Sequence, residues 1–581
     1  MTRRTASYQQ DQKKFNDVIA WRHLDSLPFF ASVRNSVAKQ EFYRSRPKQV
    51  KKDLMGRVLG RVSASIETRE QLARIEANRA LLSVSEGLTR GDLRLSWDDD
   101  SLRAWADAKA KKCEEFEGDE NWLFKIECLV ESYGFQMPSY TQKDFFFGDF
   151  SDVMRACNNR WWLRQARVAK VRAIDQLARA FKMVHAKAQP YVSNEAVKLR
   201  RAQVRRNRAT LEGFEAINQE GQAYTLAELS DLSVSNPTNR RHELMVRMRG
   251  FEELADFFGM TGLFITLSAP SRFHPMRQIK NARGRLVRVV ENPNYEGGTP
   301  RDAQDWLNKT WQLIRAEFAR ENIGTFGFRV VEPHSDGCPH WHQLLFFSPD
   351  EIQKVKSIFK EYSLRTDSQE KGADEYRLKI VLIDKSKGSA AGYIAKYICK
   401  SIDGSHIDAD LLGNSGVTAA ERICAWASAW GIRQFQQIGG GSVTVWRELR
   451  RLDSAEGITE EARAFADSGD WAAYCLLQGN GSPFVSRDAA PIQAAYWQEV
   501  NASTGEIITS DENQYGEKSP GKLFGLFDVE AGKHYLSRFY SWTIQRVGAA
   551  VKAVVKAFPV SDLSEDDLLD LMRGDGLGSI A

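Results

Sequence analysis

Three of the chain's nine histidines lie in one short segment, residues 331–347, which reads "VEPHSDGCPHWHQLLFF". Two of them, His340 and His342, flank a single tryptophan and lead into an apolar run that predicts a β-strand. Successive side chains of a strand point to opposite faces, so both imidazoles share one face and Trp341 points to the other. Two imidazoles side by side on a strand form half of a metal site.

The third ligand of such a site is open to more than one interpretation. The preceding strand is predicted to end at Glu332, and the short turn after it brings this carboxylate beside the histidines. Two histidines and a carboxylate suit a divalent cation that also binds a substrate oxygen. His334 is an alternative third ligand, and Cys338 with the two histidines would form a zinc site. The same two-histidine, one-carboxylate set also serves non-haem iron oxygenases.

Two tyrosines further along the chain offer nucleophiles. Tyr393 and Tyr397 are four residues apart in a predicted helix, residues 389–402, so their hydroxyls share one face. Lys396 and Lys400 lie on the neighbouring stripe, where their ammonium groups can hold phosphate. Tyrosines at this spacing usually indicate core packing. Beside a metal-binding strand they indicate phenolate attack on a metal-polarised phosphodiester, which leaves a covalent phosphotyrosine.

The elements around these residues predict an α+β domain. Strands are predicted at 262–268, 324–332, 340–347 and 375–384, and helices at 301–322, after Ser348, and at 389–402. This is the ferredoxin-like β-α-β-β-α-β order with one extra helix. Ser348, Pro349 and Glu351 predict an N-cap, a first helical position and a capping box. Residues 269–300 form a loop long enough to suggest a function, and residues 403–452 read as a helix, a glycine turn and another helix.

Positive charge is concentrated between Arg155 and Phe214, where fifteen Lys or Arg residues stand against three Asp or Glu. The whole chain has a formal net charge of only +5, so this block, predicted as two long helices, indicates a polyanionic partner. A solvated helical face is the alternative. The candidate DNA contacts are Arg160, Trp161, Arg164, Arg200, Arg201, Arg205 and Arg206. Trp161 and Trp162 either stack on bases or, the preferred interpretation, pack in the core.

Composition narrows the class of protein. A chain of 581 residues is too long for one hydrophobic core, and 42% hydrophobic with 27% charged residues is typical of soluble globular proteins. No apolar run approaches the length of a membrane span, and no secretory signal is recognised. Seven scattered cysteines without a CxxC motif predict reduced thiols and a cytoplasmic location.

Two of these motifs together resemble one protein family. The segments "EPHSDGCPHWHQLLFF" and "AGYIAKYICK" closely resemble the bacteriophage replication gene A proteins, which are rolling-circle initiators of the HUH endonuclease superfamily. The resemblance extends to "FITLSAPSRFHP" and to flanking segments from about residue 155 to 452. Cys338 stands where Thr is expected and Ser335 also departs from the pattern. Both lie in the turn, so little effect on the ligands is expected.

The resemblance implies that His340 and His342 bind Mg²⁺ or Mn²⁺ and that Tyr393 and Tyr397 are the nucleophiles. His274, in the first motif, is expected to orient DNA or pack the site. The implied reaction is site- and strand-specific nicking of the phage origin, with one tyrosine linked to the 5′-phosphate. The freed 3′-OH primes the host polymerase, and the second tyrosine acts when the strand is rejoined after rolling-circle synthesis.

The implied organisation has five parts. They are a helical region (1–150), a basic helical DNA-binding region (151–255), an HUH endonuclease domain (256–405), a helical extension (406–455) and a C-terminal region (456–581). The segment "GEKSPGKL" nearly matches a P-loop, but Leu523 stands where Ser or Thr is needed. A host helicase is therefore expected as a partner, beside single-stranded and duplex origin DNA, in the cytoplasm of a bacterial host.

Three other functions are compatible with parts of the pattern. The first is the same chemistry in a transposase or conjugative relaxase. The second is a non-catalytic DNA-binding initiator whose histidine cluster is a structural zinc site. The third is an iron oxygenase, which would use neither tyrosine.

Overall fold

The computed structural model describes residues 91–137 and 148–548, together with residues 38, 74, 77 and 78. Within these limits, residues 284, 371, 405–414, 497–498, 501–506, 509–514 and 516–521 are not described. The chain divides into two compact units: Met1–Val184 with Asn513–Glu517, and His185–Glu512 with Lys518–Ala581. Most of the predicted helical region at 1–150 lies outside the described residues. The five finer boundaries stay predictions.

The first unit is helical where it is described. Its helices are α4 (Asp99–Glu114), α5 (Trp122–Ser132), α6 (Gly148–Ala156) and α7 (Asn159–Ala180). Trp162 is fully buried, and its indole N–H donates to the Ala156 carbonyl over 2.7 Å. Trp161 packs edge-on against Trp162 with ring centroids 4.9 Å apart, and also against Phe135. The tandem tryptophans are therefore core residues, as the preferred interpretation held.

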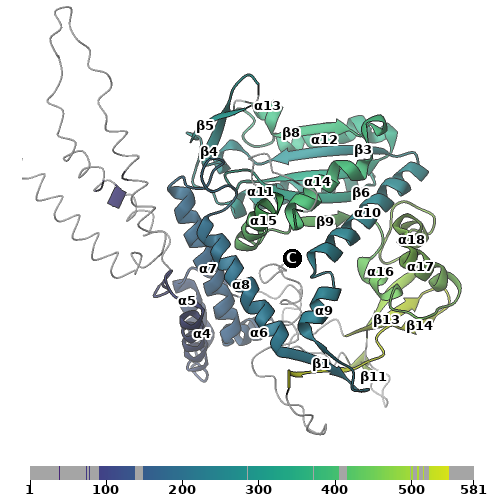
Figure 1. Cartoon of the computed structure of the whole chain (residues 1–581), viewed down its shortest axis with the longest axis horizontal. Helices are drawn as coiled ribbons and strands as arrows, with labels where there is room; N and C mark the ends of the chain where they lie inside the picture. Colours follow the sequence, from purple (N-terminus) through teal and green to yellow (C-terminus); the bar gives the residue numbers. More distant parts are fainter. Residues whose placement is uncertain are drawn as a thin grey trace, which may run out of the picture. The chain divides into compact units, whose positions relative to one another are not determined.

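A five-stranded antiparallel sheet organises the second unit (Figure 1). Its order is β8 (Leu378–Leu382), β3 (Thr261–Ser268), β7 (Pro339–Phe347), β6 (Phe326–Pro333) and β9 (Phe435–Ile438). The strand with both site histidines, β7, is thus the central one. Mixed helix and sheet confirm the predicted α+β class.

Helices cover both faces of this sheet. One face carries α11 (Pro300–Arg320) and α12 (Ile352–Ser363), and the other carries α10 (Pro237–Phe257) and α14 (Ala390–Ile402). The Trp341 indole donates to Gln304 on α11 over 3.0 Å, whereas Leu344 and Phe346 join the core shared with α10 and α14. Alternation along β7 is therefore as predicted, and it turns the site histidines toward α14.

Three local predictions were wrong. Residues 435–438, predicted within a helix–turn–helix, form β9, because the open edge of β6 supplies its hydrogen-bond partners. Residues 269–300 are no plain loop, since they contain the hairpin β4 (Met276–Lys280) and β5 (Leu286–Glu291) and the short 3₁₀ turn η1 (Ser271–Phe273). Ser348 is an N-cap, but only of the 3₁₀ turn η2 (Pro349–Glu351), and no side-chain cap bond forms.

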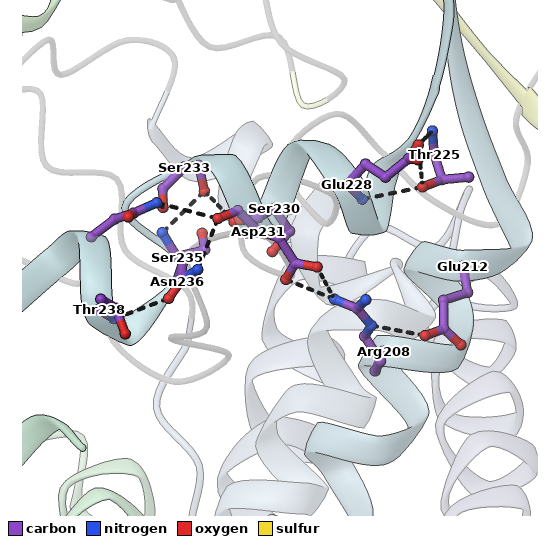
Figure 2. A network of polar contacts seen from close by, with 11 residues as sticks. Arg208, Glu212, Thr225, Glu228, Ser230, Asp231, Ser233, Ser235, Asn236 and Thr238 are labelled. Carbon is purple, nitrogen blue, oxygen red and sulfur yellow. Dashed lines mark hydrogen bonds and ion pairs between the residues drawn. The ribbon is translucent and has the colours of Figure 1, made fainter. Parts of the chain in front are cut away.

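The basic segment after residue 190 leads into a small sheet, and Figure 2 shows polar contacts among the helices and the loop beside that sheet. Helix α8 (Asn194–Gly213) is followed by β1 (Phe214–Asn218), β2 (Ala223–Thr225) and α9 (Leu226–Leu232), and β1 pairs with the distant β15 (Trp542–Arg546). Arg208 pairs with Glu212 and Asp231 (Figure 2). Thr225 and Glu228 form the capping box that starts α9.

The remaining elements complete the second unit. They are α13 (Ala373–Tyr376), η3 (Lys385–Lys387), α15 (Gly416–Trp430), α16 (Val443–Leu449), α17 (Gly457–Ser468), α18 (Trp471–Gln478), β10 (Ile492–Tyr496), β11 (Glu499–Val500), β12 (Ile507–Ile508), β13 (Leu523–Asp528) and β14 (Lys533–Leu536). None of the seven cysteines is joined in a disulfide. In the part of the chain that the structure describes, no helix has the length and apolarity to cross a membrane.

Candidate active site

The β6–β7 hairpin brings three potential metal ligands together. Its register places Glu332 directly opposite His340, and His342 lies two residues further along the same face. One ligand atom from each of the three side chains lies within 4.8 Å of the others. Among the described residues this is the one such cluster, and Cys338 and His334 are not members of it. The geometry favours Glu332 over both as the third ligand.

The two imidazoles present their Nε2 atoms to each other across 2.9 Å. Thr266, opposite His342 in the register of β3 and β7, brings its hydroxyl within 3.1 Å of His342 Nδ1. When the Thr266 oxygen accepts from Nδ1–H, Nε2 keeps the lone pair that a metal needs. Two nitrogen lone pairs converging beside a carboxylate form a donor set that fits a divalent cation.

Burial keeps these histidines neutral. It is the main cause that lowers the pKa of His342 to about 3 and that of His340 well below its ordinary value, with His334 and Lys400 adding smaller effects. Metal binding requires a neutral imidazole. Both side chains are therefore in the ligating form at neutral pH without any change in protonation.

Glu332 is held by two neighbours on α14. Its carboxylate accepts from Lys400 Nζ over 3.0 Å and from Ser401 Oγ over 3.2 Å. Burial raises the pKa of Glu332, and the positive charge of Lys400 opposes that rise. Lys400 thus neutralises a buried carboxylate rather than standing free to hold phosphate, whereas Lys396 is exposed.

Both tyrosines lie on α14, on the side that meets the sheet. The ring of Tyr397 packs on the ring of His342, with centroids 4.0 Å apart. Phe264 on β3 contacts both tyrosines, with ring centroids 5.7 Å from Tyr397 and 6.1 Å from Tyr393. Burial raises the pKa of Tyr397. The Tyr397 hydroxyl is therefore a protonated phenol at neutral pH.

The start of α14 is fixed from α10. Glu252 accepts hydrogen bonds from the backbone N–H groups of Ala390 and Ala391 over 2.6 and 3.0 Å, and Ser389 caps the helix through Gly392 N–H. A carboxylate at a helix N-terminus satisfies free N–H groups and complements the helix dipole. This contact sets the position of the tyrosines along the sheet.

His274 directly follows η1 and contacts the turn between β6 and β7. Its Nδ1 lies 2.9 Å from Asp336, and its ring centroid is 5.0 Å from that of His334, which stacks in turn on His340 at 4.0 Å. Burial acts to lower the pKa of His274, but Cys338 and Asp336 outweigh it and raise that pKa well above its ordinary value. The structure places His274 where it packs the site.

Known proteins resemble most of this region. The family model described as "Bacteriophage replication gene A protein (GPA)" matches residues 133–405. These residues place the chain in the bacteriophage replication gene A protein family. The chain is 38% identical to the replication gene A protein of Escherichia phage 186 over 68% of its length and 55% of that protein.

Two further relatives share comparable stretches. The replication gene A protein of Escherichia phage P2 is 33% identical over 76% of this chain and 58% of its own length. A probable replication endonuclease from a prophage-like region of Salmonella paratyphi A is 32% identical over 70% and 49%. The chain spans about half the length of the curated relatives it matches. No solved structure matches it.

The candidate DNA contacts of this replication gene A family member fall in both units. Arg160, Trp161 and Arg164 lie on α7 of the first unit. Arg200, Arg201, Arg205 and Arg206 lie on α8 of the second unit. Arg201 forms an ion pair with Glu421, which neutralises part of this positive charge, and Arg200 donates to the uncharged Gln203.

Sequence reasoning missed several residues that support the site. Thr266, Phe264, Ser401 and Glu252 all contact a candidate ligand, a tyrosine or the helix that carries the tyrosines. Strand register would have pointed to Thr266, since it lies directly opposite His342. Nothing local in the sequence singles out Glu252, because its partner lies 138 residues away.

We predict that Thr266→Val weakens metal binding without unfolding the protein. Valine keeps the shape of threonine but removes the oxygen that orients His342, and loss of such an outer partner costs about 10- to 100-fold in metal affinity. Mn²⁺ titration by calorimetry measures the effect, and Thr261→Val at the far end of the same strand is the control. Unchanged affinity in Thr266→Val would show that the hydroxyl does not orient His342.

We further predict that the metal-free protein loses stability as pH falls from about 7 to 5. The unfolded chain's histidines take up protons near their ordinary pKa of about 6.5, whereas His334 and His342 stay neutral until about pH 3. Each therefore costs about 2 kcal/mol of folding free energy at pH 5. The measurement is urea unfolding at pH 7 and at pH 5 with a chelator present. Between these pH values, His334→Asn should lose about 2 kcal/mol less folding free energy than the unaltered chain. Equal losses in the two proteins would contradict the prediction.

Proposed function

We propose that this chain initiates phage DNA replication as an HUH endonuclease, nicking one origin strand through a tyrosine and later rejoining it. The observation that carries the proposal is the Tyr397 ring, 4.0 Å from the ring of His342 and beside the cluster of Glu332, His340 and His342. A relative named as a probable replication endonuclease supports the same activity.

The topology supports an HUH-type domain. The strands β3, β6, β7 and β8 with helices α11 and α12 follow the β-α-β-β-α-β order, and their spatial order is β8-β3-β7-β6. This is a ferredoxin-like arrangement with the tyrosine helix α14 added on the opposite face. Such a sheet places ligands from two adjacent strands, β7 and β6, beneath a nucleophile from the added helix.

Mg²⁺ or Mn²⁺ held by Glu332, His340 and His342 would supply polarisation of a phosphoryl oxygen. The phenolic oxygen of Tyr397 or Tyr393 attacks phosphorus and gives up its proton. The bond from phosphorus to the 3′-oxygen breaks, and that oxygen leaves as a free 3′-OH. The 5′-phosphate remains on the tyrosine, so the energy of the phosphodiester is kept for rejoining.

The two tyrosines allow two such transfers in sequence. The first leaves a 3′-OH that a host polymerase can extend, and a host helicase would open the duplex ahead of it. The second tyrosine then attacks the regenerated junction, and the released 3′-OH displaces the first tyrosine to close the strand. Each step exchanges one phosphodiester for another and consumes no water.

The rival functions fit the site less well. A structural zinc site built with Cys338 is disfavoured because that thiol lies outside the ligand cluster of the described residues. An iron oxygenase is disfavoured because a single sheet with helices on both faces differs from the double-sheet barrel usual for those enzymes. The relatives named as phage replication proteins favour replication over transposition or conjugation.

A covalent-adduct assay tests the proposal. The protein is incubated with single-stranded DNA fragments that together cover the phage genome, with Mn²⁺, Mg²⁺ or chelator, then denatured and separated on a gel. We expect a metal-dependent, SDS-resistant adduct on one fragment, with the DNA joined through its 5′-phosphate to a tyrosine. DNA binding without an adduct under any metal would instead support the non-catalytic initiator.

A further inference from the structure

The β4–β5 hairpin is a strongly basic and exposed element of the second unit. Five cationic side chains lie on it, namely Arg277, Lys280, Arg283, Arg285 and Arg288, and all five are exposed. Its one acidic residue is Glu291, the last residue of β5, and no Asp or Glu occurs from Pro275 to Val290. The hairpin stands at one end of the five-stranded sheet (Figure 1).

These five charges have no acidic partner among the residues that the structure describes. Among the described residues, none of the five takes part in an ion pair, unlike Arg201 and Arg208 on α8. An exposed cluster of like charges repels itself and lowers stability unless an anion covers it. The hairpin therefore has the charge pattern of a binding element.

The hairpin is fixed beside the candidate active site. Gln278 on β4 donates to the hydroxyl of Ser335, in the turn between β6 and β7, over 2.7 Å. At its base, Asn292 donates to the carbonyl of His274 over 2.9 Å, and near its tip Lys187 donates to the carbonyl of Val287. The turn that the hairpin contacts immediately precedes the strand that carries His340.

The two faces of the hairpin differ. In the β4–β5 register, Gln278 pairs with Val289 on the face that meets the turn. Arg277 lies opposite Val290, and Arg288 lies opposite Ile279, which puts both arginines on the other face. At the tip, the Asn281 side chain accepts from the backbone N–H groups of residues 283 and 285 over 3.0 and 2.9 Å, which orders the turn.

We propose that the β4–β5 hairpin binds duplex DNA next to the nicked strand, with its arginine face in the major groove. A two-stranded ribbon, whose strands lie about 5 Å apart, fits the major groove of a DNA duplex, which is about 12 Å wide. Its Arg and Lys side chains reach the phosphates on either side. The assignment of DNA as the polyanion rests on the proposed function. The position of the hairpin beside the candidate active site does not depend on the proposed function.

Duplex rather than single-stranded DNA is the form that this element fits. Binding of unpaired bases relies on aromatic side chains for stacking. Residues 275–291 contain no Phe, Tyr or Trp. The hairpin offers charge and a narrow two-stranded shape, which match the backbone and groove of a duplex.

The test compares the full chain with Arg277→Gln/Arg288→Gln and with a matched control, Lys309→Gln/Arg315→Gln, on exposed positions of α11. Fluorescence anisotropy measures binding to a short mixed-sequence duplex and, separately, to one of its strands, over a range of salt concentrations. We expect the duplex affinity of the hairpin variant to fall about tenfold or more. The slope of log K against log salt concentration should become shallower by about two, because two phosphate contacts are removed. The control should bind like the unaltered chain.

Three outcomes would overturn the proposal: unchanged duplex binding in the hairpin variant, an equal loss in the control, or an equal loss on the single strand. The last would assign the hairpin to unpaired DNA. Adduct formation on single-stranded DNA is measured in parallel and should survive in the hairpin variant. Absence of any adduct in the unaltered chain would refute the proposed nicking activity, while selective loss of duplex binding would still support the hairpin assignment.

Discussion

We expect the double variant Tyr393→Phe/Tyr397→Phe to form no detectable covalent adduct with origin DNA. Removing the nucleophile of a hydrolytic site costs on the order of 10⁶-fold in rate, and here both phenolic oxygens are lost. Phenylalanine keeps the rings that pack on Phe264 and His342, so the helix and the ligand cluster stay in place. The measurement is the adduct assay on denaturing gels, with circular dichroism to confirm folding.

The single variants separate the roles of the tyrosines. Because both rings lie against Phe264 on the same helix face, each single variant should still form an adduct, within about tenfold of the unaltered chain. Tyr376→Phe, on the exposed α13, is the matched control and should behave like the unaltered chain. An adduct that persists in the double variant would remove both tyrosines from the mechanism.

Replacing a cluster ligand should abolish metal-dependent chemistry and metal-dependent stability together. For His342→Ala we expect the Mn²⁺ affinity to fall by at least about 100-fold, because a metal-donating atom is removed. This loss exceeds the one expected when only a residue that orients a ligand is replaced. In the unaltered chain, Mn²⁺ at about 100 times its Kd should stabilise the fold by about 2.7 kcal/mol. The variant should lose this shift in thermal unfolding as well as the adduct.

His242→Ala, a histidine on α10 outside the cluster, is the control for this comparison. It should keep both the Mn²⁺-dependent stabilisation and adduct formation. Equal Mn²⁺ stabilisation in His342→Ala and in the unaltered chain would show that the cluster does not bind the metal. Measuring thermal stability together with adduct formation distinguishes a loss of metal binding from a loss of DNA binding.

Strand alternation made the central part of the site predictable. Spacing alone put His340 and His342 on one face with Trp341 on the other, and the structure has Trp341 bonded to α11 and His342 against α14. The short turn likewise predicted that Glu332 lies beside His340, as the β6–β7 register shows. These contacts are local, so a short stretch of sequence contains the information that specifies them.

Predictions failed where a strand has no apolar alternation of its own. Residues 435–438 form a strand because the edge of β6 lies open beside them, not because of any alternation of their own. The hairpin at 276–291 has charged residues on exposed faces and so lacks the apolar periodicity that marks a buried strand. In both cases a neighbouring strand supplied the hydrogen bonds that define the element.

By itself, the sequence determined which residues can do chemistry: two histidines sharing a face, a carboxylate across a short turn, and two phenols one helical turn apart. Only the tertiary structure decided how they are used. It packs the ring of Tyr397 on His342, pairs Lys400 with Glu332, and places the Thr266 hydroxyl beside Nδ1 of His342. The physical reason is that backbone periodicity dictates the direction of a side chain, whereas the packing of separate elements dictates which group it meets.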